Sequence, residues 1–227
     1  MIPIKLTKIK YGETWIPASM AYVQGSATEQ IPISLLFYLV EYADRKMLVD
    51  VGCDEMGTNW KTSAITRPVE VLSACGLHPE DITDIILTHS HEDHIGAIAS
   101  FLYGTVYIQQ EEFLLAGEKL KDRPNVITFT DAYILDDMVS VHKIGGHSIG
   151  SCVVHIRRPD TTYVLAGDEC YVQRCLDEQL ITGASYNADA SIAFLQQYRQ
   201  AEFTVCLFHD VTDRFLPGRS GFVTQII

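Results

Sequence analysis

The sequence has no run of basic residues and no excess of positive charge. Among its 227 residues, 29 acidic side chains stand against 17 basic ones, and the formal net charge is −12. A nucleic-acid binder needs lysines and arginines to replace the counterions of phosphate groups, and a membrane-surface protein needs them to bind anionic lipids. We therefore expect neither nucleic acid nor a membrane as a partner.

Long hydrophobic segments and cysteine pairs are also missing. The most apolar stretch, residues 31–40, is too short to span a bilayer, and residues 1–11 alternate apolar side chains with lysines, unlike the core of a signal peptide. The six cysteines form no CxxC pair, which indicates reduced thiols; Cys75, Cys152 and Cys206 stand in apolar runs that predict burial. These absences favour a cytoplasmic protein.

What the chain does contain is enough apolar material for one substantial core. Hydrophobic residues make up 47% of the sequence and charged residues only 20%, which excludes intrinsic disorder. Sandwiches and α/β layers often exceed 200 residues without dividing, so we expect a single domain over residues 1–227.

Short runs rich in β-branched and aromatic residues alternate with helical patterns, which predicts sheets covered by helices, a mixed α and β class. We predict strands at residues 1–11, 33–41, 46–51, 85–87, 105–109, 126–130, 139–144, 152–158, 163–166 and 203–208, and helices at 67–75, 95–102, 110–122 and 189–200. In the helix at 110–122 we expect an apolar face of Phe113, Leu114 and Leu120 opposite a polar face of Glu111, Glu112, Glu118 and Lys121.

The most informative segment is Thr88-His89-Ser90-His91-Glu92-Asp93-His94, which directly follows a predicted buried strand. Residues i and i+2 of an extended segment point to the same side, so His89 and His91 can bind one metal ion. Asp93 and His94 begin the next turn and point elsewhere, towards a second ion. Imidazole and carboxylate ligands suit zinc, iron or manganese, and zinc is the commonest choice for hydrolysis.

Three further candidate ligands each stand at the end of a predicted strand. They are His147 after Gly145-Gly146, Asp168 after Ala166-Gly167, and His209 after Leu207-Phe208. Strand ends at one edge of a sheet converge on a cleft, where ligands of α/β proteins gather. We therefore expect these side chains to complete a metal centre begun by the histidine-rich segment.

With these motifs the sequence resembles the metallo-β-lactamase superfamily, whose HxHxDH signature corresponds to His89, His91, Asp93 and His94. The resemblance covers residues from about 33 to 210 and implies an αβ/βα four-layer sandwich. It implies a first metal ion held by His89, His91 and His147, and a second held by Asp93, His94 and His209, with Asp168 bridging both. Asp50 matches an early strand-end aspartate of the family that supports the ligands without binding metal.

Within this superfamily the chain looks most like the N-acyl-homoserine lactonases. Tyr171 stands three residues after Asp168, where those enzymes place a tyrosine that polarises the substrate carbonyl, and residues 183–189 also resemble their sequence. The resemblance implies a cyclic ester as the small-molecule substrate and two divalent ions as cofactors. In the hydrolysis that we expect, a hydroxide between the ions attacks the lactone carbonyl, with Asp93, Asp168 and Tyr171 as the catalytic side chains.

Several alternatives stay open. Tyr171 can instead be a packed aromatic residue, and the chain can be a glyoxalase-type thioesterase, an iron oxidoreductase of the same fold or a non-catalytic metal-binding module. A homodimer is also compatible with the sequence. Among the remaining residues, we expect His78, His142, His155 and Glu92 to be solvent-facing or hydrogen-bonded rather than ligands, and an apolar pocket rim from Trp15, Met20, Trp60, Phe215 and Leu216.

Overall fold

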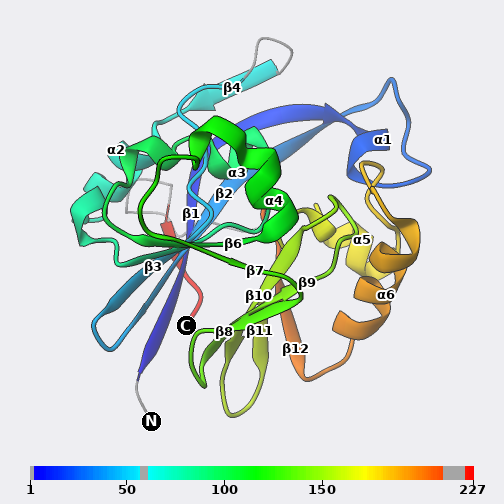
Figure 1. Ribbon diagram of the computed structural model, residues 1–227. Helices are drawn as coiled ribbons and strands as arrows, with labels where there is room; N and C mark the ends of the chain where they lie inside the picture. Colours follow the sequence, from blue (N-terminus) through cyan, green and yellow to red (C-terminus); the bar gives the residue numbers. More distant parts are fainter. Residues whose placement is uncertain (1–2, 57–60, 212–222) are drawn as a thin grey trace.

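The computed structural model describes residues 3–56, 61–211 and 223–227, and two β-sheets form its centre (Figure 1). In these ranges the larger sheet has eight strands, four of which (β3, β5, β6 and β7) run parallel to one another. In spatial order they are β13 (Val223–Gln225), β1 (Ile4–Pro17), β2 (Gln30–Tyr42), β3 (Arg45–Val49), β5 (Asp84–Ile86), β6 (Thr105–Gln109) and β7 (Val126–Phe129), with β4 (Lys61–Ile65) paired to β1.

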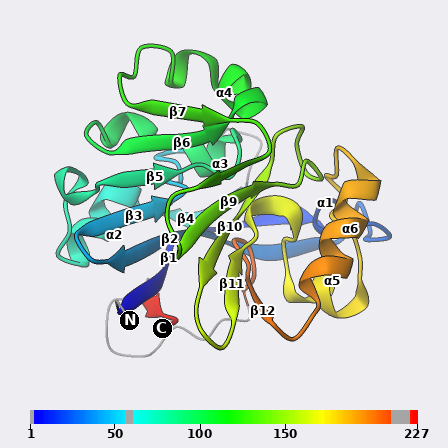
Figure 2. The ribbon, with the colours of Figure 1, turned by 60° about the horizontal axis from the view of Figure 1, so that its bottom comes forward.

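Within the described ranges the smaller sheet has five strands, and it faces the larger one (Figure 2). Its strands are antiparallel except for the parallel pair β11 and β12. In spatial order they are β12 (Phe203–Cys206), β11 (Thr162–Leu165), β10 (Cys152–Arg157), β9 (Val139–Lys143) and β8 (Ala132–Ile134).

Alternating side chains on the strands divide the interior into three cores. On β2, Leu35, Phe37 and Leu39 pack on the outer side of the large sheet, whereas Tyr38 and Val40 fill the space between the two sheets. Because successive side chains of a strand point to opposite faces, a strand buried on both sides is apolar without interruption. The third core lies on the outer side of the small sheet.

Helices cover both outer faces, which confirms the predicted four-layer αβ/βα sandwich. The large sheet is covered by α2 (Pro68–Ala74), α3 (Glu92–Ile95) and α4 (Gln110–Ala116), and the small sheet by α5 (Gln173–Glu178) and α6 (Ala188–Tyr198), with α1 (Ala18–Ala21) beside them (Figure 1). None of the helices in the described ranges combines the length and the hydrophobicity that crossing a bilayer requires.

The helix predicted at residues 95–102 is wrong. A single helical turn, α3, ends at Ile95, and a 3₁₀ turn follows at Ile98–Ser100. The cause is a pair of backbone hydrogen bonds to the loop after β3: the N–H of Ala97 donates to Gly52, and the carbonyl of His94 accepts from Val51. These bonds replace those of a continuing helix and fix the histidine-rich loop to the large sheet.

The helix predicted at residues 110–122 is shorter than expected, and it packs on the sheet with a different face. It ends at Ala116, with Leu114 70% exposed and Glu112 0% exposed, so the predicted apolar and polar faces are wrong at both positions. Cys75 is another error, because it caps the C-terminus of α2 and is exposed, whereas Cys152 and Cys206 are buried as predicted.

Candidate metal centre

All seven predicted ligands lie at one end of the two sheets, on loops that follow strands. The loop with His89, His91, Asp93 and His94 follows β5, and the other three ligands follow β9, β11 and β12. They are His147, Asp168 and His209. The strands of both sheets therefore deliver their C-terminal loops to one place, as expected for a sheet edge that carries a site.

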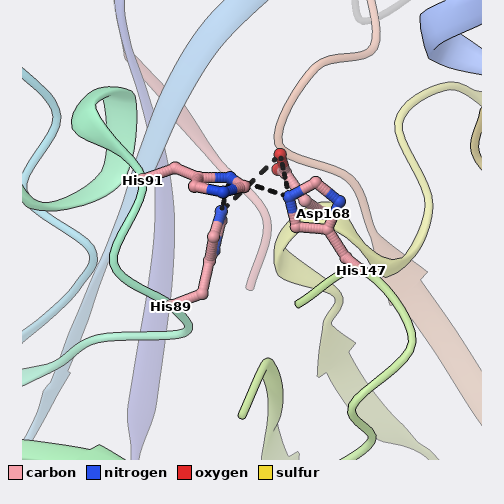
Figure 3. A group of neighbouring side chains, drawn as sticks. All are labelled: His89, His91, His147 and Asp168. Carbon is pink, nitrogen blue, oxygen red and sulfur yellow. Dashed lines mark hydrogen bonds and ion pairs between the residues drawn. The ribbon is translucent and has the colours of Figure 1, made fainter. Parts of the chain in front are cut away.

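The first group consists of His89, His91, His147 and Asp168, whose side chains point to a common centre (Figure 3). The Nδ1 atom of His91 lies 3.1 Å from Nε2 of His89 and 2.9 Å from Nε2 of His147. The Oδ2 atom of Asp168 lies 3.4 Å from Nε2 of His147 and 3.8 Å from Nε2 of His89. These four donor atoms all fall within 4.8 Å of one another.

The second group consists of Asp93, His94 and His209, and Asp168 also borders it. The Oδ2 atom of Asp93 lies 3.7 Å from Nε2 of His94 and 3.7 Å from Nε2 of His209. The other carboxylate oxygen of Asp168, Oδ1, is 3.0 Å from His94 and 2.9 Å from His209. Asp168 thus presents one oxygen to each group.

Buried hydrogen bonds orient several of these rings. Asp50, in a left-handed conformation with φ of 60°, accepts from the backbone N–H and the hydroxyl of Thr88, and its Oδ2 lies 2.7 Å from Nδ1 of His94. The carbonyl of Ser34 lies 2.9 Å from Nδ1 of His209. In both rings the remaining nitrogen, Nε2, is directed to the second group, and such supporting contacts are typical of metal-binding histidines.

The electrostatics of the first group fit a metal ion. Burial lowers the pKa of His89 well below its usual value and the pKa of His147 to about 4, so both rings are neutral and present lone pairs. Burial alone would raise the pKa of Asp168, but the positive charges of His94 and His209 hold it well below its usual value. His89 and His147 therefore offer neutral imidazoles and Asp168 an ionised carboxylate, the ligand forms that a divalent cation needs.

The second group also fits a cation. Burial would lower the pKa of His94, but the carboxylates of Asp168, Asp93 and Asp50 outweigh it and raise that pKa well above its usual value. The Nε2 atom of His94 is buried without a hydrogen-bond partner, although Asp168 lies 3.0 Å away. Asp168 and Asp93 lie near this nitrogen and Asp50 lies at the other nitrogen of the ring, so the three carboxylates form a place where positive charge is stabilised.

A cavity of about 300 Å³ opens beside both groups. Its polar wall contains His91, Glu92, Asp93, His147 and Asp168, and its apolar wall contains Met20, Met56, Tyr171 and Ala184. The predicted pocket rim is therefore confirmed at Met20. Trp15 is 43% exposed and does not line this cavity, and Trp60, Phe215 and Leu216 lie outside the described residues.

Tyr171 lies between the cavity and the two groups. Its ring is 7% exposed and makes edge contacts with the rings of His209 and His147, at centroid distances of 4.9 and 5.9 Å. Burial raises the pKa of Tyr171 well above its usual value, and the carboxylates of Asp168 and Asp93 raise it further. The hydroxyl therefore keeps its proton and can donate a hydrogen bond.

Two buried glutamates near the centre were not predicted. Glu112 and Glu169 are 0% and 1% exposed, and both accept hydrogen bonds from the segment around His147. The sequence around each glutamate does not indicate that it is buried, because the loops that bury it are distant in the chain. The expectation for other histidines holds: His142 lies 2.9 Å from the Ser140 hydroxyl, and His155 lies 2.9 Å from the Tyr198 hydroxyl.

Comparison with known proteins places this geometry in a family. The model of the metallo-beta-lactamase superfamily matches residues 36–202. The N-acyl homoserine lactonase AiiB of Agrobacterium fabrum (strain C58 / ATCC 33970) is 31% identical, with 91% of this chain and 92% of that protein covered. The protein of the same name from Rhizobium rhizogenes (strain K84 / ATCC BAA-868) is 29% identical, with the same coverage.

A solved structure gives the same result at the level of the fold. The B. thuringiensis AiiA crystal structure with N-decanoyl-L-homoserine bound at the active site superposes with a TM-score of 0.79 at 21% identity, and covers 91% of this chain and 93% of that one. The chain therefore belongs to the metallo-beta-lactamase superfamily. The predicted family and the prediction of a hydrolytic enzyme are confirmed.

Proposed function

We propose that this protein is a metal-dependent lactonase that opens the ring of an N-acyl homoserine lactone or a similar cyclic ester. The observation that carries the proposal is the position of Asp168, which presents one carboxylate oxygen to each of the two histidine groups. Asp168 also lines the cavity of about 300 Å³, whose wall is partly apolar. The two lactonases named above, which align with nine-tenths of the chain, support the substrate class.

In this proposal two divalent ions, zinc with iron or manganese as alternatives, occupy the two groups. His89, His91 and His147 would hold the first, and Asp93, His94 and His209 the second, with Asp168 shared between them. When bound, such ions supply Lewis acidity and make a water molecule nucleophilic at neutral pH.

The chain's own residues then orient the substrate and manage the proton. The side chain of Asp93 is 12% exposed and borders both the cavity and the second group, so its carboxylate can accept the proton that the attacking water releases and pass it to the departing alkoxide. The hydroxyl of Tyr171 would donate a hydrogen bond to the carbonyl oxygen as negative charge develops there. Met20, Met56 and Ala184 provide apolar surface for the acyl group.

Replacing Tyr171 with phenylalanine should lower kcat about 10–100-fold and change KM little, because the hydrogen bond strengthens only as the oxyanion forms. A single preorganised donor is often worth about 10²–10³-fold, and we expect less here because a metal ion would share the same oxygen. The measurement is steady-state hydrolysis of N-hexanoyl-homoserine lactone at matched metal content. Tyr103→Phe, 66% exposed in the wild type, is the matched control.

Equal kcat values for Tyr171→Phe and wild type would make Tyr171 a packing residue. The lactonase proposal would then lose the residue that distinguishes it from other hydrolases of the family.

The charge around the cavity favours a neutral substrate. Glu92, Asp93 and Asp168 line it, and no lysine or arginine does so among the described residues. Lys119 forms an ion pair with Glu92 at 2.9 Å and does not itself line the cavity; the Glu92 side chain is 53% exposed. A thioester of glutathione carries carboxylates of its own, and the lack of a lysine or arginine at the described wall of the cavity leaves them without a cationic side chain to bind, which disfavours it.

We therefore expect kcat/KM for a neutral N-acyl homoserine lactone to exceed that for a glutathione thioester by about 100-fold, since the carboxylates of the thioester would find no cationic side chain at the cavity and would meet Glu92 there. Glu92→Gln should improve the thioester about threefold and leave the lactone unchanged, a small effect because solvent screens this exposed group. Glu118→Gln, whose carboxylate does not line the cavity, is the control. A thioester turned over as well as the lactone would reject the substrate class and favour a glyoxalase-type enzyme.

A further inference from the structure

Glu112, on α4, places a fully buried carboxylate directly behind the first histidine group. It is not one of the candidate ligands, and it is 0% exposed. Its Oε2 atom accepts from the backbone N–H of Ser90 at 2.9 Å and from the Ser90 hydroxyl at 2.7 Å. Its Oε1 atom accepts from the Ser148 hydroxyl at 2.6 Å and from the N–H of Gly150 at 3.0 Å.

These four donors come from the two loops that carry the histidines. Ser90 stands between His89 and His91, and Ser148 directly follows His147. A buried carboxylate is costly unless donors satisfy it, and an ionised carboxylate offers about four lone-pair positions. All four positions of Glu112 are thus occupied, and the carboxylate joins two segments more than fifty residues apart in the sequence.

Glu112 is itself firmly held. The side chain of Gln109 caps α4 by accepting from the N–H groups of Glu111 and Glu112, and its amide donates to the carbonyl of Thr130 on the other side. A Cβ added at Gly150 would meet Oε1 of Gln109 at 2.2 Å and Cγ of Glu112 at 2.9 Å. The loop after His147 therefore lies directly on the first turn of α4, where only glycine fits.

His91 depends most on this arrangement. It is the exposed member of the first group, so surrounding side chains constrain its ring less than those of buried His89 and His147. The position of the ring then follows from the backbone at Ser90, which Glu112 holds, and the 2.9 Å separation from His147 follows from the loop at Ser148.

We propose that Glu112 is a positioning residue that fixes the His89–His91 loop against the His147 loop and so sets the metal affinity of the first group. The inference rests on the proposed function, because it requires metal ions at this centre. It adds a specific claim: the affinity of one group, and not of the other, depends on a helix residue that contacts no ligand side chain directly.

Glu112→Gln tests the claim with little change in size. A glutamine keeps one acceptor oxygen, and its amide group would face two donors that it cannot satisfy. Removing a residue that orients metal ligands typically costs about 10–100-fold in metal affinity, and we expect that loss for the first group. The second group, which includes Asp93, His94 and His209, should keep its affinity.

The experiment is a titration of metal-free protein with Co²⁺, followed by visible absorption and by competition with a chelator, on wild type, Glu112→Gln and Glu118→Gln. Glu118 has the same side chain at 86% exposure and is the matched control. His91→Ala identifies which binding step belongs to the first group. We expect Glu112→Gln to weaken that step alone and Glu118→Gln to weaken neither.

If both binding steps of Glu112→Gln match the wild type while the metal-free protein melts at a lower temperature, Glu112 only stabilises the fold and the inference is wrong. If Glu112→Gln does not fold, Ser148→Ala replaces it in the test, because this variant removes one of the four donors to Glu112. Ser148→Ala should also lower the Co²⁺ affinity of the first step. An unchanged affinity would overturn the inference. A wild type that binds no Co²⁺ would instead reject the proposed function itself, an outcome visible before any variant is compared.

Discussion

Asp168→Asn is expected to lower lactone turnover by about 10³-fold or more, the largest effect of any single substitution in this protein. The two carboxylate oxygens lie 2.9 Å from His209 and 3.4 Å from His147, one in each group. An asparagine removes the negative charge from both groups and turns a hydrogen-bond donor towards ring nitrogens that should face a cation. The loss should therefore combine lower metal occupancy with lower kcat.

The measurement is turnover of N-hexanoyl-homoserine lactone together with metal content, in Asp168→Asn and in Asp160→Asn. Asp160 lies in the exposed turn between β10 and β11 and should tolerate the same substitution. The expected loss leaves about a thousandth of the wild-type turnover. If Asp168→Asn instead binds as much metal as the wild type and retains more than about a tenth of its turnover, Asp168 does not hold the position proposed for it.

Removal of metal should lower the melting temperature by about 10 °C. At a free metal concentration 1,000 times the dissociation constant, binding to the folded state alone stabilises it by about 4 kcal/mol, and each kcal/mol shifts the melting temperature of a chain of this size by about 2–4 °C. Without metal, the rings of His89 and His147 and the carboxylate of Asp168 remain buried close together, with no ion to coordinate.

Thermal unfolding with and without a chelator measures this effect, and restoring zinc should restore the transition. His89→Ala serves as the control, because a centre that has lost one ligand should respond less to the chelator. Superimposable transitions of the wild type in both conditions would mean that metal adds nothing to the folded state.

Much of the fold could be predicted because each strand has a recognisable pattern in its own short stretch of sequence. The apolar run at residues 33–41 is buried on both faces in β2, and strands such as β6, at Thr105–Gln109, match their predicted bounds. The candidate ligands could be found for a similar reason. Each either lies in the dense motif between His89 and His94 or directly follows a strand, and the strands carry them to one edge.

What could not be predicted depends on contacts between distant segments. The helix after His94 stops because its backbone groups pair with Val51 and Gly52, which a helical pattern in residues 95–102 does not reveal. The strand β1 continues past Tyr11 to Pro17 because it pairs with β2 along its whole length, through a register shift between Lys10 and Gly12.

Glu112 illustrates the same limit at the candidate site. In a helix that contains both glutamates and leucines, a charged side chain is expected to face water and a leucine to face the core. Here the order is reversed, because the donors of Ser90 and Ser148 make burial of Glu112 favourable while Leu114 remains exposed. The burial of a polar residue that binds two distant loops cannot be recognised from the periodicity of its own helix.

The most direct test of the account is lactone turnover by metal-free protein as zinc is added in known equivalents. Hydrolysis of N-hexanoyl-homoserine lactone should rise until two zinc ions are bound per chain and then stay constant, because both groups around Asp168 must be filled. Activity that saturates at one equivalent would contradict the two-metal centre, and saturation with zinc without any lactone hydrolysis would contradict the proposed function.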